Sequence, residues 1–311
     1  MNGFFNILKP PGMSSAAVVA VMRRLTGEKR TGHAGTLDPE AAGVLPIMTG
    51  KATRLFDYLV DKEKEYEAVC AFGSSTDTQD ATGTILETGD RYPELVTVRE
   101  KAQELTGAII QRPSAFSAIK IGGRPLYSMA RKGEKVEVPE RIVTVKSIEV
   151  TGEEPEHGFA LRIRCGKGTY IRTLCDDLGK KCDCPAHMRS LLRTKSGVFT
   201  LETALTLDEA RKLAAEGRLI EKMLPPDYPL NHLKKVEIPE RFSKQAATGA
   251  KIPAEILKEP VEETENLRVY LNNEFWGIMH RQGPMLVWKA QIAPEQGKDS
   301  NSYFKSQGEA Q

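Results

Sequence analysis

An aspartate stands in a stretch of the chain that is rich in glycine and proline. Asp38 lies within residues 32–54, GHAGTLDPEAAGVLPIMTGKATR. Gly35 and Gly43 permit backbone conformations and close approaches that a side chain would forbid, which suits a loop that faces a ligand. A carboxylate in such a loop can act as a base or as a nucleophile. The structural alternative is that Asp38 caps a helix and that Pro39 takes its first position.

An arginine stands at the beginning of a predicted helix. Residues 167–174 read KGTYIRTL, and Ile171, Leu174 and Leu178 have helical spacing, so Arg172 falls in or near the first turn. The helix macrodipole disfavours a cation at that end, and a surface arginine would be a mild misfit. A buried carboxylate partner would offset this cost. The position therefore favours an ion-paired arginine.

Four potential metal ligands follow that arginine. Cys175, Cys182, Cys184 and His187 have the spacing C-x6-C-x-C-x2-H, which lacks the C-x2-C pairs typical of zinc sites. Cys175 also belongs to the apolar stripe of the predicted helix, where a free cysteine packs as a small core residue. We therefore predict no metal site. Five cysteines without a regular framework favour a reducing compartment, the cytoplasm by default.

Two predicted strands position further polar residues. Residues 64–72 alternate, with Tyr66, Ala68 and Cys70 on one side, and a tyrosine on a strand face is ordinarily a core or rim aromatic. In residues 159–165 the apolar side chains point one way, while Arg162 and Arg164 point the other.

The turn-rich stretch 73–83, GSSTDTQDATG, could suggest metal ligands, but local turn hydrogen bonds explain it better.

Helix boundaries are marked by capping residues. Ser14 and Ser15 are N-cap candidates for a first helix that ends at Gly27. Thr97-x-x-Glu100 and Thr206-x-x-Glu209 both have the form of a capping box, so each is predicted to open a helix.

The composition is that of an ordinary globular protein. The chain has 311 residues, 28% of them charged, and a net charge of +2, which by itself indicates no nucleic-acid partner. No apolar run has the length of a transmembrane span, and the first residues, MNGFFNILKP, lead us to expect no secretory signal. Residues 159–200 are locally basic, with nine Lys or Arg against three acids. That segment is either a solvated face or a surface for phosphates.

A proline-rich linker predicts two domains. PPDYP at residues 225–229 separates a first domain, 1–229, from a region of short strands, 230–294, with a hairpin at Asn272-Asn273. Residues 295–311 are polar and are predicted to be disordered.

The stretch around Asp38 resembles the motif of bacterial tRNA pseudouridine-55 synthases, the TruB family, G-H-x-G-x-L-D-P-x-A-x-G-V-L-P. All eleven fixed positions are present between Gly32 and Pro46. Lys9 opens a KPPGMSS segment similar to another family motif. KGTYIRT matches the family segment whose arginine pairs with the catalytic aspartate. QRPSAFSAIK matches a further family segment, except that Phe116 stands where the family usually has tyrosine. The resemblance covers nearly all of residues 4–224.

The resemblance implies the roles of individual residues. Asp38 would be the catalytic carboxylate, supported by Tyr66 against the target base, by Arg172 as its ionic partner and by Leu191 packing in the site. RNA contacts would come from the residues His33, Lys9, Lys167, Arg162 and Arg164.

The same resemblance implies a fold and an activity. We expect an α+β catalytic domain with a mixed, largely antiparallel sheet, followed by a small β-barrel related to PUA domains. The enzyme would isomerise uridine 55 in the T-loop of tRNA after flipping the base, with no cofactor, obligate protein partner or guide RNA, as a monomer. The aspartate could attack covalently or remove a sugar proton to start a glycal route. The alternatives are a non-catalytic RNA-binding or RNA-folding protein on the same scaffold, which would not need Asp38, Tyr66 and Arg172 together, and a guide-RNA-dependent relative.

Overall fold

The chain divides into two compact units that are each assembled from separate segments. The computed structural model describes residues 1–60, 62–117, 119–130, 132–134, 136–257 and 259–293. Unit 1 comprises Met1–Pro39, Val44–Val60 and Gly197–Gln311, and unit 2 comprises Glu40–Gly43 and Asp61–Ser196. The polar tail expected at 295–311 lies outside the described residues. No helix in the described part of the chain is long and apolar enough to cross a membrane.

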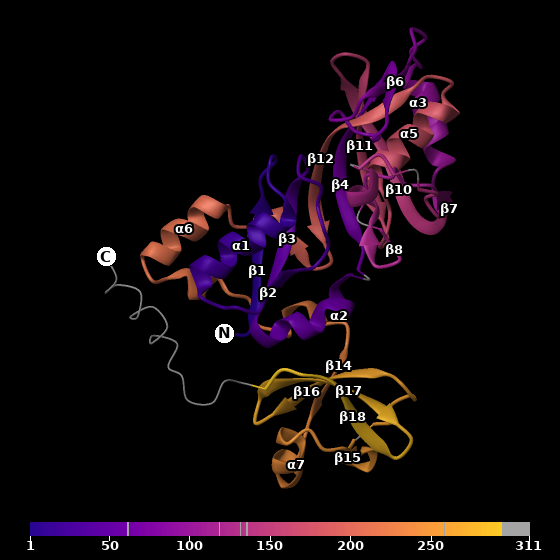
Figure 1. Ribbon diagram of the computed structural model, residues 1–311. Coiled ribbons are helices and arrows are strands. Elements are labelled where there is room, and N and C mark those ends of the chain that lie inside the picture. Colours follow the sequence, from indigo (N-terminus) through magenta and orange to yellow (C-terminus); the bar gives the residue numbers. More distant parts are fainter. Residues whose placement is uncertain (61, 118, 131, 135, 258, 294–311) are drawn as a thin grey trace. The chain divides into compact units, whose positions relative to one another are not determined.

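Unit 1 contains the N-terminal strands and helices and the C-terminal β region (Figure 1). Its first elements are β1 (Gly3–Lys9), α1 (Ser15–Thr26), β2 (Thr31–His33), β3 (Ala42–Thr49), of which residues 44–49 belong to this unit, η1 (Gly50–Leu55) and α2 (Phe56–Val60). The chain returns with β13 (Phe199–Thr200), η2 (Leu201–Thr203), α6 (Leu207–Ala215), η3 (Leu219–Lys222) and η4 (Tyr228–Leu230).

The first helix forms as its capping residues predict. The Ser14 side chain accepts a hydrogen bond from the Ala17 amide at 3.1 Å, and Gly27 ends the helix in the left-handed conformation. Val18 and Met22, one turn apart, are fully buried in a cluster that also holds Ile7 of β1 and Ile47 of β3. The two strands and α1 thus share one apolar core.

The expected small β domain is a five-stranded sheet in the order β14-β16-β17-β18-β15. The turn between β16 and β17 is Asn272-Asn273, and both residues have positive φ, as a tight hairpin turn requires. The sheet buries Leu267 and Met279, while Ile278 of β17 joins the cluster around Leu55. The elements of this region are β14 (Lys234–Glu237), η5 (Glu240–Phe242), α7 (Ser243–Ala247), β15 (Ile252–Pro253), η6 (Ala254–Ile256), β16 (Asn266–Leu271), β17 (Glu274–Gln282) and β18 (Met285–Gln291).

Unit 2 is built on an antiparallel sheet in the order β12-β4-β11-β10-β7. The beginning of β3, Ala42 and Gly43, runs parallel to β12. The expected mixed, largely antiparallel α+β fold is confirmed. The elements are β4 (Lys64–Phe72), β5 (Ser74–Thr76), β6 (Ile85–Thr88), α3 (Leu95–Gln103), β7 (Gly107–Gln111), β8 (Lys120–Ile121), β9 (Arg124–Pro125), α4 (Leu126–Ala130), β10 (Arg141–Glu154), β11 (Gly158–Cys165), α5 (Ile171–Lys181) and β12 (Ala186–Ser196).

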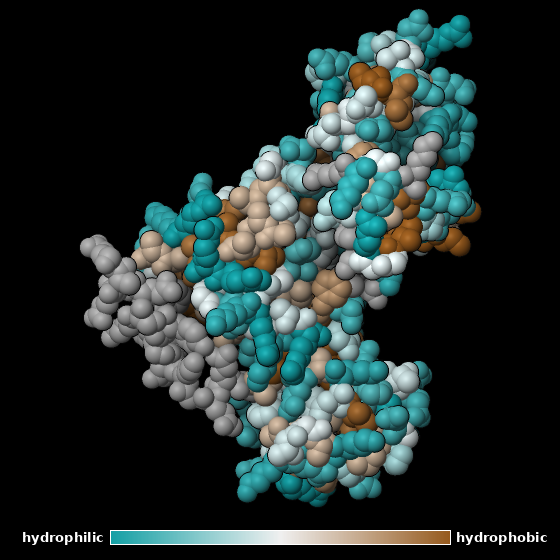
Figure 2. Space-filling view, viewed as in Figure 1, coloured by the Kyte–Doolittle hydropathy of each residue, from teal (hydrophilic) through white to brown (hydrophobic). Residues whose placement is uncertain are grey.

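Apolar side chains also reach the surface of unit 2 (Figure 2). Among them are Ile110 on β7 and Ile142 on β10, which lie opposite each other across the two strands and are exposed to 64% and 77%.

One of the two predicted capping boxes is wrong. Thr206 and Glu209 bond reciprocally and open α6, as predicted. α3 instead begins at Leu95, after Glu94, so that Thr97 lies inside its first turn. The helix starts earlier because the amide of Val98, a fully buried residue, donates to the Glu94 carbonyl at 3.0 Å.

Candidate catalytic site

Asp38 lies in irregular backbone between β2 and β3. Pro39 and Glu40 form a turn, and the chain then enters β3 at Ala42. No helix begins at Pro39, so the interpretation of Asp38 as a helix cap is wrong. The side chain is half-buried, and Leu37 beside it is 4% exposed. The aspartate thus lies where the chain changes from the interior to the surface.

Two buried side chains hold the main chain on either side of Asp38. Ser15 Oγ accepts from the Leu37 amide at 2.9 Å and donates to the Leu37 carbonyl at 3.0 Å. Lys9 Nζ donates to the carbonyls of Pro39 and Pro10, both at 2.8 Å. These bonds fix the backbone before and after the aspartate, which limits the positions that its carboxylate can take.

Lys9 was expected either to shape the site or to contact RNA, and its contacts are those of a residue that shapes the site. Its side chain is fully buried, and the ammonium group binds backbone carbonyls. A buried ammonium cannot neutralise a phosphate in solvent. His33, the neighbouring candidate, is half-buried on β2 opposite Ile47.

Tyr66 and Leu191 lie on one face of the sheet in unit 2. Tyr66 is 7% exposed, and Leu191 is 9% exposed and pairs with Ala68, two residues further along β4. Side chains at alternate positions, and those directly opposite across strands, share a face. The predicted alternation of β4 is confirmed by the burial of Tyr66, Ala68 and Cys70.

α5 covers that same face of the sheet. Cys70, which shares the face with Tyr66, directs its thiol toward the carbonyl of Cys175 in α5, at 3.7 Å. The helix begins at Ile171, so Arg172 lies in its first turn as predicted. Unit 2 therefore brings Tyr66, Leu191 and the helix that contains Arg172 together.

Arg172 is buried and surrounded by acceptors. Its Nη1 donates to the Thr78 carbonyl at 2.9 Å and lies 3.4 Å from Asp80 Oδ2, and its Nη2 donates to the Phe116 carbonyl at 3.1 Å. The side chain is only 6% exposed. A carboxylate and two carbonyl dipoles therefore offset the unfavourable position of this cation at a helix N-terminus.

Asp80 is in turn held by its own loop. Its Oδ1 accepts from Thr78 Oγ1 at 2.8 Å, from Thr82 Oγ1 at 2.6 Å and from the Thr82 amide at 3.0 Å. The predicted turn chemistry of residues 73–83 is thus present, and it also presents the second carboxylate oxygen to Arg172. Sequence reasoning missed this role of Asp80.

Two glutamines fix the helix that carries Arg172. Gln111, fully buried, donates to the Tyr170 carbonyl at 3.1 Å and accepts from the Tyr170 amide at 3.0 Å. Gln79 accepts from Thr173 Oγ1 at 2.8 Å and donates to Asp176 at 3.0 Å. The first turn of α5 thus has side-chain support although its N-cap residue supplies no capping bond.

Arg193 is a further buried cation, which the sequence indicated only as part of the basic segment 159–200. It is 1% exposed and lies opposite Tyr66 on β12, on the same face of the sheet. β3 approaches it closely, because a Cβ on Gly43 would lie 2.3 Å from the Arg193 carbonyl oxygen. Gly43 has φ +121°, so both its conformation and the space require glycine.

The arginines expected to contact RNA on β11 are engaged in ion pairs. Arg162 lies 3.1 Å from Glu149, and Arg164 lies 2.6 Å from Glu65. The hydrogen bond from Arg164 lowers the pKa of Glu65. Lys167 is exposed between β11 and α5. The charges of Arg162 and Arg164 are therefore compensated by acids on the two neighbouring strands, β10 and β4.

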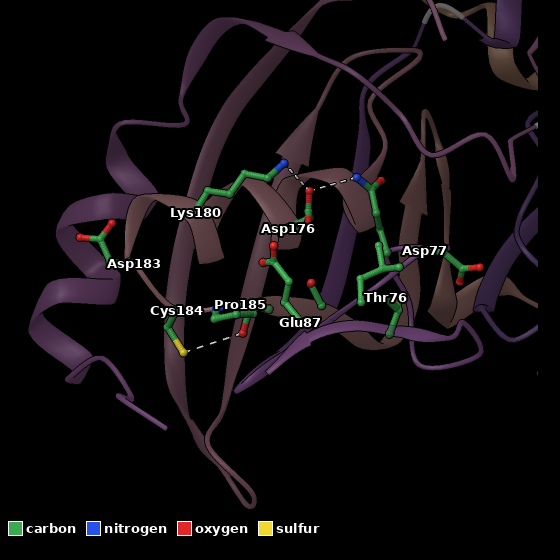
Figure 3. A pocket seen from close by; sticks show the side chains of 12 residues that line it. Thr76, Asp77, Glu87, Asp176, Lys180, Asp183, Cys184 and Pro185 are labelled. Carbon is green, nitrogen blue, oxygen red and sulfur yellow. Dashed lines mark hydrogen bonds and ion pairs between the residues drawn. The ribbon is translucent and has the colours of Figure 1, made fainter. Parts of the chain in front are cut away.

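A pocket of about 500 Å³ lies beside the loop that holds Asp80 (Figure 3). Asp176 in its wall accepts from Gln79 at 3.0 Å and from Lys180 at 2.6 Å. None of the predicted catalytic residues lines it.

The residues considered as zinc ligands have other surroundings. Cys175 and Cys184 are buried, and His187 Nδ1 lies 2.9 Å from the Ser74 carbonyl oxygen. In the described part of the chain, no group of three or more His, Cys, Asp or Glu could hold a metal ion.

Two family models match the chain. Residues 23–171 match the TruB family pseudouridylate synthase N-terminal domain, and residues 172–231 match the tRNA pseudouridylate synthase B C-terminal domain. Sequence relatives are similar over most of their length. The tRNA pseudouridine synthase B of Alkaliphilus oremlandii is 42% identical over 89% of this chain and 92% of that protein. The Bacillus licheniformis protein of the same name is 43% identical over 80% and 82%.

Solved structures show the same fold. A Cbf5-Nop10-Gar1 complex contains a chain that is 26% identical, with a TM-score of 0.72 over 94% of this chain and 85% of that one. An H/ACA RNP bound to a substrate RNA containing 2′-deoxyuridine contains a chain that is 24% identical, with the same TM-score and coverage.

Proposed function

The chain belongs to the TruB family of pseudouridylate synthases, and we propose that it isomerises uridine 55 in the T-loop of tRNA, with Asp38 as the catalytic carboxylate. Formation of pseudouridine in tRNA follows from the family. The choice of uridine 55 rests on the complete motif around Asp38, all eleven fixed positions of which are present.

The reaction transfers the uracil base from one attachment to another. The bond between N1 and ribose C1′ breaks, a bond between C5 and C1′ forms, C5 loses a proton and N1 gains one, so that the product is an isomer. Nothing is oxidised and no group is lost. Both routes open to Asp38, an adduct at C1′ and a glycal formed after loss of a sugar proton, require an ionised carboxylate at the ribose.

Arg172 is proposed as the ionic partner of Asp38. The observation that carries this part of the proposal is its buried guanidinium, which is held by Asp80 and by the carbonyls of Thr78 and Phe116. A cation fixed in this way can orient a carboxylate through a charge-assisted hydrogen bond. Tyr66 is proposed to stack on the uracil and to assist loss of the C5 proton, and Leu191 to pack beside it.

Binding of tRNA is proposed to need neither a guide RNA nor a protein partner, with the chain acting as a monomer. The target base must leave the folded loop, at a cost of a few kcal/mol, and His33 is proposed to help hold the T-loop in that state. We propose that residues 1–229 form the catalytic domain and that residues 230–294 add contacts to the RNA. Lys167, exposed before α5, remains a candidate for a phosphate contact.

The test is to map pseudouridine in a tRNA transcript after incubation with the purified chain alone. We expect modification at uridine 55 and at no other uridine. Asp38→Asn, which is nearly isosteric, should bind the transcript and form no detectable pseudouridine. If this variant retained a tenth of the wild-type rate, Asp38 would not be the catalytic carboxylate. Modification at another uridine would refute the proposed position.

A further inference from the structure

A cluster of four exposed cations follows the first helix. Arg23 and Arg24 lie in the last turn of α1, and Lys29 and Arg30 lie in the link to β2 (Figure 1). Among the residues that the structure describes, none of the four forms an ion pair with a carboxylate. Only Arg23 has a side-chain hydrogen bond, to the Thr31 carbonyl at 3.5 Å.

The nearest acid in the sequence does not compensate this charge. Glu28 is only 18% exposed, and its Oε2 lies 3.6 Å from the N-terminal ammonium of Met1. Its Oε1 accepts from the backbone amide of Arg30 at 3.0 Å. The carboxylate is thus directed toward main-chain groups.

Stabilisation of the helix explains the position of only two of the four cations. Cations in the last turn of a helix interact favourably with the macrodipole, which accounts for Arg23 and Arg24. Lys29 and Arg30 lie beyond Gly27, where the helix has ended. The contrast with Arg162 and Arg164 is direct, because those two arginines have acidic partners.

We propose that Arg23, Arg24, Lys29 and Arg30 form a surface that binds RNA phosphates outside the reacting loop of the tRNA. This proposal rests on the proposed function for the identity of the RNA. Unpaired exposed cations gain most from phosphates, because binding releases condensed counterions without breaking an existing ion pair.

The location of the cluster defines which part of the RNA it contacts. Thr31 pairs with Thr49 at the end of β3, and the Arg30 carbonyl accepts from the Gly50 amide. The eight residues of β3 span roughly 25 Å, so the cluster lies far along the strand from the loop of Asp38. The phosphates that it contacts are therefore placed outside the T-arm that holds the modified uridine.

The experiment measures the dissociation constant of full-length tRNA as a function of salt. The variant Arg24→Gln/Lys29→Gln/Arg30→Gln removes three charges and no side-chain hydrogen bond of the described structure, and Arg23 is retained because of its bond to Thr31. Each lost phosphate contact lowers the slope of log K against log salt by about 0.9. Between 50 and 200 mM salt the wild-type protein should therefore lose about fortyfold more affinity than the variant.

A matched control removes the same charge from the same unit. Arg211, Lys212 and Arg218 are exposed on and after α6, and Arg211 and Arg218 have acidic partners. The variant Arg211→Gln/Lys212→Gln/Arg218→Gln should keep the wild-type slope. An equal fall in slope with this control would mean that only net charge matters, and would overturn the proposal.

Two further measurements distinguish this surface from other sites of phosphate contact. An isolated T-arm hairpin should bind the wild-type protein and the Arg24/Lys29/Arg30 variant alike; an equal loss with the hairpin would place the contact within the T-arm and refute the proposed location. If Arg162→Gln/Arg164→Gln lowered the slope and the Arg24/Lys29/Arg30 variant did not, the phosphate surface would lie on β11. Mapping of pseudouridine made by the wild-type protein tests the proposed function independently, since the slopes are measured whether or not product forms.

Discussion

The loop of Asp38 and the surroundings of Arg172 are held by different kinds of contact. Around Asp38, Ser15 and Lys9 bind main-chain groups of the residues before and after it. Around Arg172, a carboxylate and two carbonyls bind the guanidinium itself. The first arrangement positions a length of backbone, and the second positions and electrically balances one side-chain head group. Changes in the first region should therefore act on folding stability, and changes in the second on the rate of reaction.

The largest effect is expected for Arg172→Lys. Lysine keeps the charge but lacks the planar group that reaches the Thr78 and Phe116 carbonyls together, so the cation is no longer fixed. Turnover should fall by about a hundredfold, equivalent to about 3 kcal/mol, with little change in tRNA affinity. Single-turnover rates and dissociation constants for the wild type, Arg172→Lys and Arg172→Ala show whether the substitution affects the reaction or the binding of tRNA. Near-normal turnover of the lysine variant would contradict a role in orienting a carboxylate.

A smaller loss is expected for Asp80→Asn. The asparagine amide has no charge to balance Arg172, and its NH2 group would face the guanidinium, which is also a donor. One charge-assisted hydrogen bond, of about 1.5 kcal/mol, is therefore lost. The single-turnover rate should fall roughly tenfold, and the melting temperature should fall as well, because the buried guanidinium loses its charged partner although the Thr78 and Thr82 bonds can remain. Thr82→Val, which removes one bond to the same carboxylate, is the matched control. A drop in melting temperature with an unchanged rate would mean that Asp80 supports the fold and not the reaction.

Lys9→Met tests the other region. The change leaves the carbonyls of Pro10 and Pro39 without their buried donor, and we expect a loss of about 1–3 kcal/mol in the free energy of unfolding. Denaturant unfolding measures it, with Ser15→Ala as a second variant on the other side of Asp38. If Lys9→Met weakened tRNA binding in a salt-dependent way without a loss of stability, Lys9 would be a phosphate contact after all.

The smallest effect concerns Arg164→Gln on the sheet surface. The bond from Arg164 lowers the pKa of Glu65 in the folded state, so the pair stabilises the fold above the unfolded-state pKa of the carboxyl. That contribution is lost as the pH falls through the lowered folded-state pKa. The difference in melting temperature between the wild type and the variant should be small at neutral pH and disappear on acidification. A difference that increases toward acid pH would show that another group is responsible.

Local signals in the sequence predicted local structure well. Ser14 and Gly27 set the ends of α1, and residues 64–72 were predicted as a strand that matches the bounds of β4. These features depend on bonds between residues close in the chain. The capping-box pattern at Thr97 failed because the same spacing also occurs inside a helix, and α3 already begins at Leu95, with the Val98 amide bonded to the Glu94 carbonyl.

The surroundings of the candidate site depended on contacts that the sequence could not supply. Arg172 was predicted to need a carboxylate, but Asp80 is 92 residues away in the chain and is aimed by its own turn. Arg193 was counted only as part of the basic segment 159–200, because its burial depends on the pairing of β12 with β4, which is irregular between Met188 and Ser190. Arg162 and Arg164 formed a basic segment in the sequence, yet their acidic partners lie on neighbouring strands.

The close approach of β3 and β12 at Gly43 limits the evolutionary routes open to this part of the protein. Any other residue there would place its Cβ 2.3 Å from the backbone oxygen of Arg193, and no rotation of a side chain relieves that clash. A second point substitution nearby could not compensate, because the obstacle is main chain. Only a displacement of one strand away from the other would restore the space, and that would disturb their pairing at Arg193 and Gly43. Position 43 is therefore closed to gradual change, whereas the exposed cations after α1 can be exchanged one at a time.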